Sequence, residues 1–324
     1  MSSETEPGGV PDFSAEDREL LSLLLERESL EPAAPASIPR RADRVVVPLS
    51  FAQERMWFLN ALEPERPLYN IPFAVRLEGR LQVEALRRAL EEVVARHEVL
   101  RTAFAVKAGR PVAVLAPPCL WFRTEDLASL SAPERDAALS GRLAGEARVP
   151  FDLAGEPPLR AALLRLGAEE YVLVLTLHHI ASDAWSVGVL VRELAALYDA
   201  FAAGRPSPLP ELPLQYADYA AWQRQALQGE ALQAEVDYWK QRLAGAPPVL
   251  ELPSDRPRPT IRSGRGGTVR RTLEPALLEE LRQLSRREGA TLFMVLLAAF
   301  KALLWRYSGQ TDVVVGTPIA GRTR

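Results

Sequence analysis

Residues Tyr171–Leu194 read YVLVLTLHHIASDAWSVGVLVREL, and this stretch decides the fold of the region around it. Its first part, YVLVLTL, is apolar at nearly every position, which is typical of a strand covered on both faces. The later part, SVGVLVREL, has apolar residues at helical spacing and opens with a serine that can cap a helix. Between the strand and the helix lie His178 and His179, two of the three histidines in the chain, and Asp183.

The paired histidines do not form a metal site by themselves. Adjacent residues on a strand point to opposite faces, so a regular strand cannot bring both imidazoles to one metal ion or one substrate atom. A zinc site needs further ligands, and the remaining candidates, His97 and Cys119, lie in unrelated sequence contexts. We therefore expect no metal site. A serine hydrolase is disfavoured as well, because no G-x-S-x-G motif frames Ser182.

The residues leave two interpretations of this stretch open. Both histidines can be structural, with their hydrogen bonds satisfied at the end of a strand. Alternatively, a neutral imidazole can accept a proton from an amine or a thiol at pH 7, which would make one histidine a general base. In that case Asp183 would hold the shape of the loop through an ion pair, and no covalent nucleophile is required.

The composition is that of a globular protein without a strong charge bias. The chain has 324 residues, of which 48% are hydrophobic and 25% charged, and its net charge is -3. This length suits two domains or lobes, and the charge gives no reason to expect nucleic acid or a membrane surface as a partner. The apolar stretches are too short or too interrupted to cross a bilayer, and the N-terminus lacks a signal-peptide pattern. Cys119 is the single cysteine, so we expect a cytoplasmic protein without an internal disulfide.

The order of the predicted elements divides the chain into three parts. Residues 1–44 read as a disordered leader, a short helix over Ser14–Leu30 and a proline-rich linker. Residues 45–214 combine strands and helices, among them an amphipathic helix over Val83–Leu100, and end in the proline-dense run GRPSPLPELPL. In residues 215–324 we expect helices and the strands TVRRTL and DVVVG. This irregular order of strands and helices favours two α/β lobes over a barrel.

The stretch HHIASDA, residues 178–184, resembles the HHxxxDG signature of condensation domains of nonribosomal peptide synthetases. Further stretches resemble motifs of the same family and follow in the family's order. They are PLSFAQERMWFLNALEPERPLYNIP (Pro48–Pro72), RHEVLRTAF (Arg96–Phe104), YADYAAWQR (Tyr216–Arg224) and VVVGTPIAGR (Val313–Arg322). Several motifs in this order are a far more specific signal than the histidines alone. The resemblance covers the chain from about Val45 to its last residue.

The resemblance implies an α/β (α+β) fold of two chloramphenicol acetyltransferase-like lobes that form a V around a central tunnel. Residues 45–214 would be the N-terminal lobe and residues 215–324 an incomplete C-terminal lobe. It also implies an enzyme that transfers a donor acyl or peptidyl thioester to the amine of an aminoacyl thioester. Both substrates would be carried on the phosphopantetheine arms of an upstream donor and a downstream acceptor carrier protein, so the domain itself would bind no cofactor.

The resemblance also assigns roles to particular residues. His179 matches the family's catalytic position, His178 would support it, and Asp183 would be structural and pair with an arginine. The candidate partners of that aspartate are Arg322, as the first choice, and Arg101 or Arg96. The substrate channel would be lined by Ala184, Trp185, Ser186, Gly316 and Pro318.

Two features depart from the family pattern. Ala184 stands where the signature has glycine, and its methyl group could narrow the site. The chain stops at Arg324, whereas family members continue with further strands of the second lobe. We therefore expect a fragment, or a broken gene product, of a larger synthetase, and low or no activity for the 324-residue chain.

The resemblance extends to a subtype and leaves alternatives. The stretches AQERMWFLNALEP, YNIP and DAWS most resemble the subtype that joins an L-donor to an L-acceptor residue. Alternatives of the same fold are a catalytically impaired interaction domain that binds carrier proteins, and an acyltransferase that uses free acyl-CoA. The retained His179 favours an enzyme, and the histidine pair together with YADYAAW favours carrier-bound substrates over CoA. The helix at Ser14–Leu30 is either a linker packed on the first lobe or a docking element for an upstream synthetase.

Overall fold

The computed structural model describes residues 38–42, 45–257, 266–267 and 269–317. Its contacts divide the chain into two compact units, one formed by Ser37–Leu232 and one that contains Gln233–Arg324. The predicted helix at Ser14–Leu30 lies outside the described residues. Both histidines of the HHIASDA stretch belong to the unit Ser37–Leu232.

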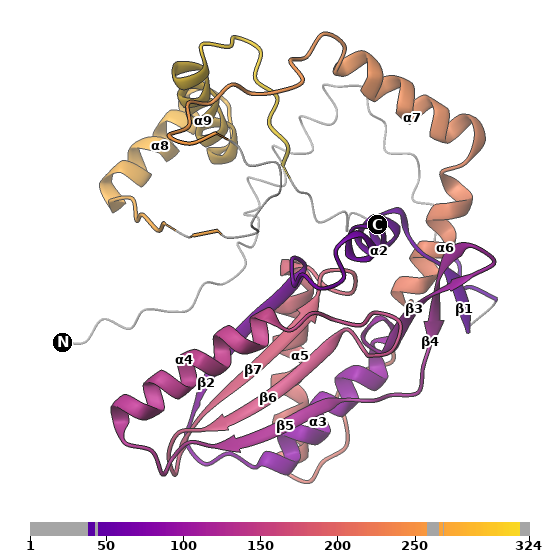
Figure 1. Ribbon diagram of the computed structural model, residues 1–324, viewed down its shortest axis with the longest axis vertical. Coiled ribbons are helices and arrows are strands. Elements are labelled where there is room, and N and C mark those ends of the chain that lie inside the picture. The colour runs from indigo at the N-terminus through magenta and orange to yellow at the C-terminus, as the bar shows by residue number, and fades with distance from the viewer. Residues whose placement is uncertain (1–37, 43–44, 258–265, 268, 318–324) are drawn as a thin grey trace. The chain divides into compact units, whose positions relative to one another are not determined.

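A four-stranded sheet with the order β2-β7-β6-β5 forms the centre of the unit Ser37–Leu232 (Figure 1). β2 (Asn70–Glu78), β7 (Glu170–His178) and β6 (Leu159–Arg165) are antiparallel neighbours, whereas β5 (Trp121–Asp126) pairs with β6 in parallel. β7 is buried at every position after its first residue, so the run YVLVLTL forms the buried strand that its composition predicts. The register of β7 with β2 places the last residue of β7 opposite the first residue of β2.

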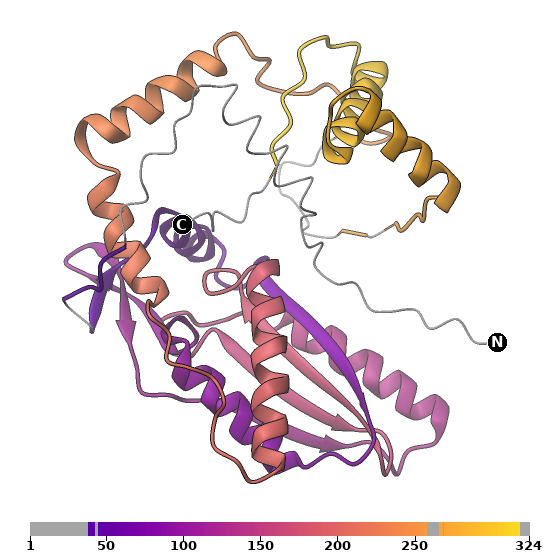
Figure 2. The same cartoon turned by 180° about the vertical axis from the view of Figure 1, so that it is seen from behind.

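Helices cover both faces of this sheet. α3 (Val83–Arg96) and α5 (Ala184–Ala202) pack on one face, which is turned toward the viewer in Figure 2. α4 (Ala132–Arg148) covers the opposite face, seen in Figure 1. Because successive strand residues point to opposite faces, Leu175 of β7 contacts the core beneath α3 and α5, and Val174 contacts the core beneath α4.

The helix predicted over Val83–Leu100 ends earlier, at Arg96. The next residue has an extended backbone, and Glu98–Arg101 form a separate 3-10 turn, η1. The side chain of Gln215 explains this end: its amide nitrogen donates to the carbonyl oxygen of Arg96 at 2.9 Å, and its amide oxygen accepts from the N–H of Glu98 at 3.1 Å. A distant side chain thus satisfies backbone groups that another helical turn would otherwise pair.

A smaller antiparallel sheet, with the order β1-β4-β3, completes the strands of this unit that the structure describes. It joins β1 (Val46–Pro48), β4 (Arg110–Leu115) and β3 (Thr102–Lys107). α2 (Phe51–Leu62) starts directly after β1. Its start is fixed by a capping box, in which Ser50 and the side chain of the third helical residue bond each other's backbone N–H groups.

α6 (Tyr216–Ala226) belongs to the same unit as the two sheets. It contacts β1 and η1, and the Arg224 side chain donates to the carbonyl oxygen of Leu49 at 2.6 Å. The compact unit therefore continues to Leu232.

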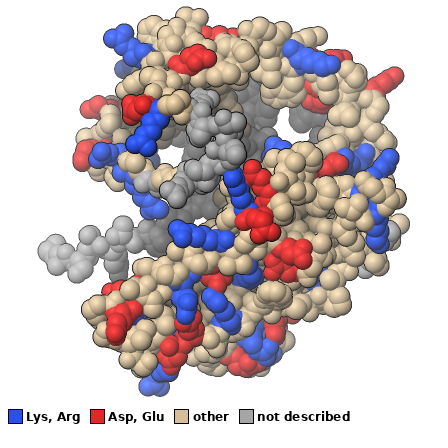
Figure 3. Space-filling model, in the orientation of Figure 1, with Lys and Arg blue, Asp and Glu red and all other residues tan. Residues whose placement is uncertain are grey.

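Surface charges of this unit are mixed. Acidic and basic side chains lie interspersed on the face that Figure 3 shows. Many of them form exposed ion pairs, for example between Arg142 and Glu125 at 2.8 Å and between Arg165 and Asp126 at 3.0 Å. Such exposed pairs stabilise a fold only slightly.

The unit that contains Gln233–Arg324 consists of helices and irregular segments in its described part. Its helices are α8 (Pro275–Arg287) and α9 (Leu292–Ser308), and α7 (Gly229–Arg242) spans the junction of the two units. The strands predicted for TVRRTL and DVVVG are wrong for the residues described, because no neighbouring strand supplies the hydrogen bonds that a ladder needs. No single helix within the described ranges has the length and hydropathy of a membrane span; α8 and α9 meet that test only as a pair bent by 103°.

Candidate functional site

The adjacent histidines at the end of β7 have opposite environments. His178 is the last residue of the strand and only 1% of its surface is exposed. His179 is the first residue of the turn that follows, and it is exposed. The alternation of side chains along a strand predicts this division between one inward and one outward imidazole.

Hydrogen bonds with three other segments of the chain fix the loop that carries His179. Its backbone N–H donates to the carbonyl oxygen of Tyr69, just before β2, at 2.8 Å. The N–H of the buried neighbour, His178, donates to the carbonyl oxygen of Pro158, just before β6, at 3.0 Å. The side-chain amide of Gln53, from α2, donates to the carbonyl oxygen at position 180 at 3.4 Å. The main chain at His179 is therefore held while its ring remains accessible.

The environment of His178 favours a neutral ring. Its Nδ1 atom accepts a hydrogen bond from the backbone N–H of Ile180 at 3.1 Å. The rings of Tyr69 and Phe151 approach it in T-shaped arrangements, with centroids at 6.2 and 5.8 Å. Burial, and to a smaller extent the neighbouring His179, lowers the pKa of His178 to about 4. The ring is therefore uncharged at neutral pH.

Asp183 is the N-cap of α5. Its Oδ1 atom accepts a hydrogen bond from the backbone N–H of Ser186 at 2.8 Å and another from the Ser186 hydroxyl at 2.6 Å. A carboxylate at this position satisfies donors that the first helical turn leaves unpaired and complements the helix dipole. Asp183 thus determines where α5 begins, directly after the histidine loop.

The arginines considered as partners of Asp183 differ in their places. Arg322 lies outside the described residues. Arg96 forms an ion pair with Glu193 of α5 at 3.2 Å. Arg101 donates to a main-chain carbonyl oxygen, that of residue 116, at 2.8 Å. The structure therefore gives both alternative arginines other partners.

The residues expected to line a substrate channel are only partly described. Ala184 and Trp185 are exposed at the start of α5, with 47% of the Trp185 surface accessible. Gly316 is exposed in the other unit, and Pro318 lies outside the described residues. Within the described ranges, Ala108 is the only residue besides glycines with a positive φ. The backbone at Ala184 therefore does not require the glycine of the HHxxxDG signature.

The third histidine has a structural partner. His97 Nε2 lies 2.7 Å from an Oε atom of Glu193, the residue that also pairs with the neighbouring arginine. Across the described residues, no group of three or more histidine, cysteine, aspartate or glutamate side chains is placed to hold a metal ion.

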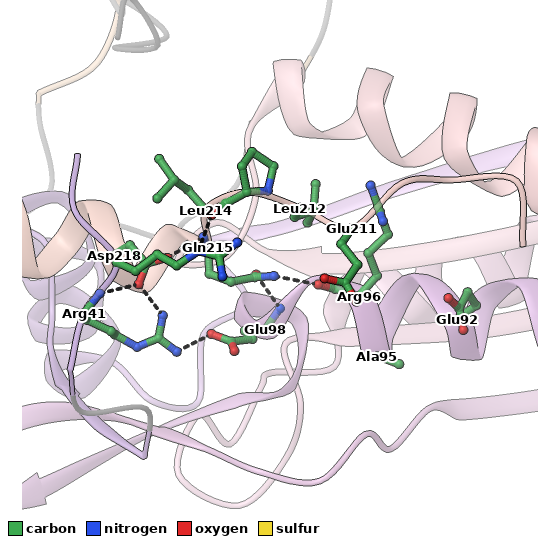
Figure 4. Close-up of a pocket in the computed structure, with 12 residues that line it drawn as sticks. Arg41, Glu92, Ala95, Arg96, Glu98, Glu211, Leu212, Leu214, Gln215 and Asp218 are labelled. Atoms are coloured by element: carbon green, nitrogen blue, oxygen red, sulfur yellow. Dashed lines mark hydrogen bonds and ion pairs between the residues drawn. The ribbon is translucent and has the colours of Figure 1, made fainter. Parts of the chain in front are cut away.

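A separate pocket of about 370 Å³ lies beside α3 and the start of α6 (Figure 4). Within its wall Arg41, with a side chain only 6% exposed, lies between Glu98 and Asp218 and approaches the latter at 2.8 Å. Burial alone would raise the pKa of Asp218, but hydrogen bonds from Gln215 and Arg41 outweigh it and hold the pKa below its usual range. Arg41 pairs with both carboxylates, so the cluster is a structural tie between three segments.

The model of the condensation-domain family matches residues 43–324. This chain belongs to the condensation-domain family. It is 46% identical over 315 residues to one of the linear gramicidin synthase subunits of Brevibacillus parabrevis, an alignment that covers 97% of this chain and 4% of that protein. It is 45% identical over 300 residues to phosphinothricin tripeptide synthetase PhsC of Streptomyces viridochromogenes, covering 92% of this chain and 28% of that protein. The chain thus spans a small part of the synthetases that it matches.

Solved structures of related domains share the fold of this condensation domain. The X-domain from teicoplanin biosynthesis is 36% identical with a TM-score of 0.74, over 86% of this chain and 61% of that one. The first condensation domain of the CDA synthetase, at 24% identity and a TM-score of 0.66, covers 84% of this chain and 64% of that one and supports the fold alone. These neighbours confirm the mixed α/β fold predicted from the sequence.

The histidine loop of this condensation domain is held by residues that the sequence did not single out. Gln53 and Tyr69 lie within the motif PLSFAQERMWFLNALEPERPLYNIP, so their place in that motif was the available signal. Phe151 packs on His178 from the loop between α4 and β6, outside every motif quoted above. Only the tertiary structure brings it to the site.

Proposed function

We propose that this chain forms amide bonds between substrates held on carrier proteins, with His179 as the residue that accepts the proton of the attacking amine. One observation carries the proposal: the His179 ring is exposed at the end of β7 while its backbone is bonded to Tyr69 and its neighbour, His178, is buried and neutral. A fixed main chain and an accessible imidazole are what a general base or a positioning group needs.

The proposed reaction is the attack of an acceptor amine on the carbonyl carbon of a donor thioester. A C–N bond forms, the C–S bond breaks, and the electron pair of the broken bond leaves with the sulfur of the donor arm. The proton lost by the attacking nitrogen passes to the His179 imidazole, which can then donate it to the leaving thiolate. Asp183 supports this step indirectly, because it fixes the start of α5 after the loop.

Both substrates arrive as thioesters on phosphopantetheine arms, the donor on an upstream and the acceptor on a downstream carrier protein. Membership in the condensation-domain family supports this part of the proposal. Resemblance of AQERMWFLNALEP, YNIP and DAWS to one subtype supports an L-configured donor and an L-configured acceptor. Ala184, Trp185 and Ser186, which follow the loop, are our candidates for the wall of the acceptor channel.

The test uses the polypeptide in which this chain occurs, together with a donor and an acceptor carrier protein loaded with aminoacyl phosphopantetheine. Mass spectrometry of the acceptor carrier measures the dipeptidyl product. We expect His179→Ala to slow transfer about 100-fold or more, with an unchanged thermal midpoint because the side chain is exposed. His97→Gln, which alters the histidine bound to Glu193, is the matched control and should keep transfer. Transfer by His179→Ala at the rate of the unchanged protein would overturn the assignment.

A second candidate function is an interaction domain without transfer activity. The observation in its favour is the likeness to the X-domain from teicoplanin biosynthesis, which has also been solved as a complex with OxyB. In that case the unchanged protein would bind a loaded carrier and yield no dipeptide. Replacing the donor carrier by a free acyl-CoA in the same assay separates a CoA-dependent acyltransferase from both.

A further inference from the structure

The loop between α4 and β6 is tied to the sheet beside His178. The carbonyl oxygen of Val149 accepts hydrogen bonds from the side-chain amide of Asn70 at 2.8 Å and from the guanidinium of Arg160 at 2.6 Å. Asn70 also donates to the carbonyl oxygen of Ala147 at 3.0 Å. Both the first residue of β2 and the second residue of β6 therefore hold the same loop.

The loop next places an aromatic ring between Arg160 and His178. The guanidinium carbon of Arg160 lies 3.9 Å from the centroid of the Phe151 ring, in a cation–π arrangement. The same ring meets the His178 ring at 5.8 Å with an interplanar angle of 79°. Arg160, Phe151 and His178 thus form one continuous row of side-chain contacts, which we call the stack.

Strand register places these groups on one face of the sheet. Asn70 is opposite His178 in the β2–β7 pair, and Arg160 is opposite Thr176 in the β6–β7 pair. Residues directly opposite in an antiparallel pair share a face, and so do residues two apart on one strand. Asn70, Arg160 and His178 therefore lie on the same face of the sheet and contact the loop there. This is the end of the sheet from which His179 emerges.

Stability alone does not account for this choice of residues. Burial lowers the pKa of Arg160, although the carboxylates of Glu156 and Glu146 act in the opposite direction, so its charged form is partly desolvated. Three buried polar atoms in this region have no hydrogen-bond partner among the described residues. They are Arg160 Nε, Asn70 Oδ1 and Thr176 Oγ1. Apolar side chains would fill the same space without such unpaired groups, so these residues call for another explanation.

We propose that Arg160 is a positioning residue for His179, acting through Phe151 and His178. Its guanidinium holds the Phe151 ring against His178 and, with Asn70, holds the loop by the carbonyl oxygen of Val149. The His178 ring is thereby kept in its pocket, and the peptide that joins the two histidines keeps one orientation. The role in transfer rests on the function proposed above, whereas the stack itself is independent of it.

The experiment replaces Arg160 with methionine, which keeps an unbranched apolar stem and removes both the charge and the donors. In the two-carrier assay we expect kcat to fall about 10-fold, with KM for the loaded acceptor within about 2-fold, because a positioning defect affects the chemical step. Arg160→Lys should give an intermediate kcat, since an ammonium group keeps the charge but lacks the planar guanidinium that lies over Phe151 while it donates to the carbonyl oxygen of Val149. Arg165→Met, at the exposed end of the same strand, is the matched control and should leave kcat unchanged.

A spectroscopic measurement on the 324-residue chain accompanies the kinetics. The imidazole ¹⁵N signals should show one state of His178 in the unchanged protein and several, or broadened, states after Arg160→Met. Phe151→Leu, which fills the core without an aromatic face, should also lower kcat and broaden the His178 signals. This variant replaces Arg160→Met as the test if the methionine variant does not fold. Unchanged kcat together with unchanged His178 signals would overturn the proposal. If the unchanged protein transfers nothing, the proposed function fails, and the His178 signals still show whether the stack holds this ring.

Discussion

The Nδ1 atom of His178 and the backbone N–H of Ile180 are joined by a hydrogen bond of 3.1 Å. Because Nδ1 is the acceptor, the ring carries its proton on Nε2 and is held as one neutral tautomer. A proton added to Nδ1 would place two donors face to face in a buried site. His178 is therefore suited to support the loop, and His179 is the imidazole left to meet a substrate.

Acidification should destabilise the folded chain through His178. Its pKa falls from the ordinary 6.5 to about 4 on folding, so the unfolded chain binds a proton that the folded chain does not bind between these values. The contribution to stability is complete above the unfolded pKa and is lost as the pH falls toward the folded one. At pH 5 we expect a loss of about 2 kcal/mol in the free energy of unfolding from this residue.

Denaturant unfolding of the unchanged chain and of His178→Gln at pH 7 and pH 5 measures this contribution. The glutamine variant should be less stable at pH 7 and should lose less stability between the two pH values. His97→Gln serves as the control, because it removes a histidine from another part of the fold. An equal pH dependence in the unchanged chain and in His178→Gln would show that His178 does not titrate as inferred.

Substitution of Asp183 should weaken the start of α5. Asp183→Ala removes the acceptor of two hydrogen bonds from Ser186, and loss of an N-cap lowers the free energy of unfolding by about 1 kcal/mol. Asp183→Asn keeps a capping oxygen and should lose less. Chemical denaturation followed by far-UV circular dichroism compares the two variants. Equal losses of stability in both variants would mean that the charge of Asp183, and not its capping oxygen, stabilises the start of α5.

The buried cluster around Arg41 should be sensitive to loss of its cation. Arg41→Met leaves the carboxylates of Glu98 and Asp218 without their cation, and breaking a buried pair in this way lowers stability by about 3–5 kcal/mol. Arg80→Met removes an exposed pair with Glu169, in which the arginine side chain is 94% exposed, and should change stability by less than about 1 kcal/mol. Thermal and denaturant unfolding measure both. Similar small effects would show that the cluster is not a structural tie.

Replacement of Gln53 should disturb both the N-terminus of α2 and the histidine loop. Gln53→Leu removes an acceptor for the backbone N–H of Ser50 and a donor to the carbonyl oxygen of Ile180. Buried groups left unpaired in this way lower stability by about 1–3 kcal/mol, and the freed loop should slow transfer in the two-carrier assay. Gln233→Leu, on an exposed face of α7, is the control with little expected effect. A variant that unfolds less readily than the unchanged chain would contradict the role given to Gln53.

Local patterns predicted the elements that carry the site. The continuous apolar run predicted β7, and strand alternation predicted that one imidazole would turn inward and one outward. The helix over Val83–Leu100 was predicted too long, because its end depends on Gln215, more than a hundred residues later. The strands at TVRRTL and DVVVG were wrong for the described residues, since a strand exists only with a partner that local pattern does not reveal.

The sequence by itself determined the family, the buried strand and the place of the histidine pair, because motif spacing and apolar periodicity are properties of neighbouring residues. Only the tertiary structure decided that His178 is the inward ring, that Phe151 and Arg160 stack behind it, and that Arg41 meets Asp218 across 177 residues of chain. Those contacts join segments that are distant in the chain. They arise when strands pair and helices pack, so the free energy that selects them belongs to the whole fold and not to any one segment.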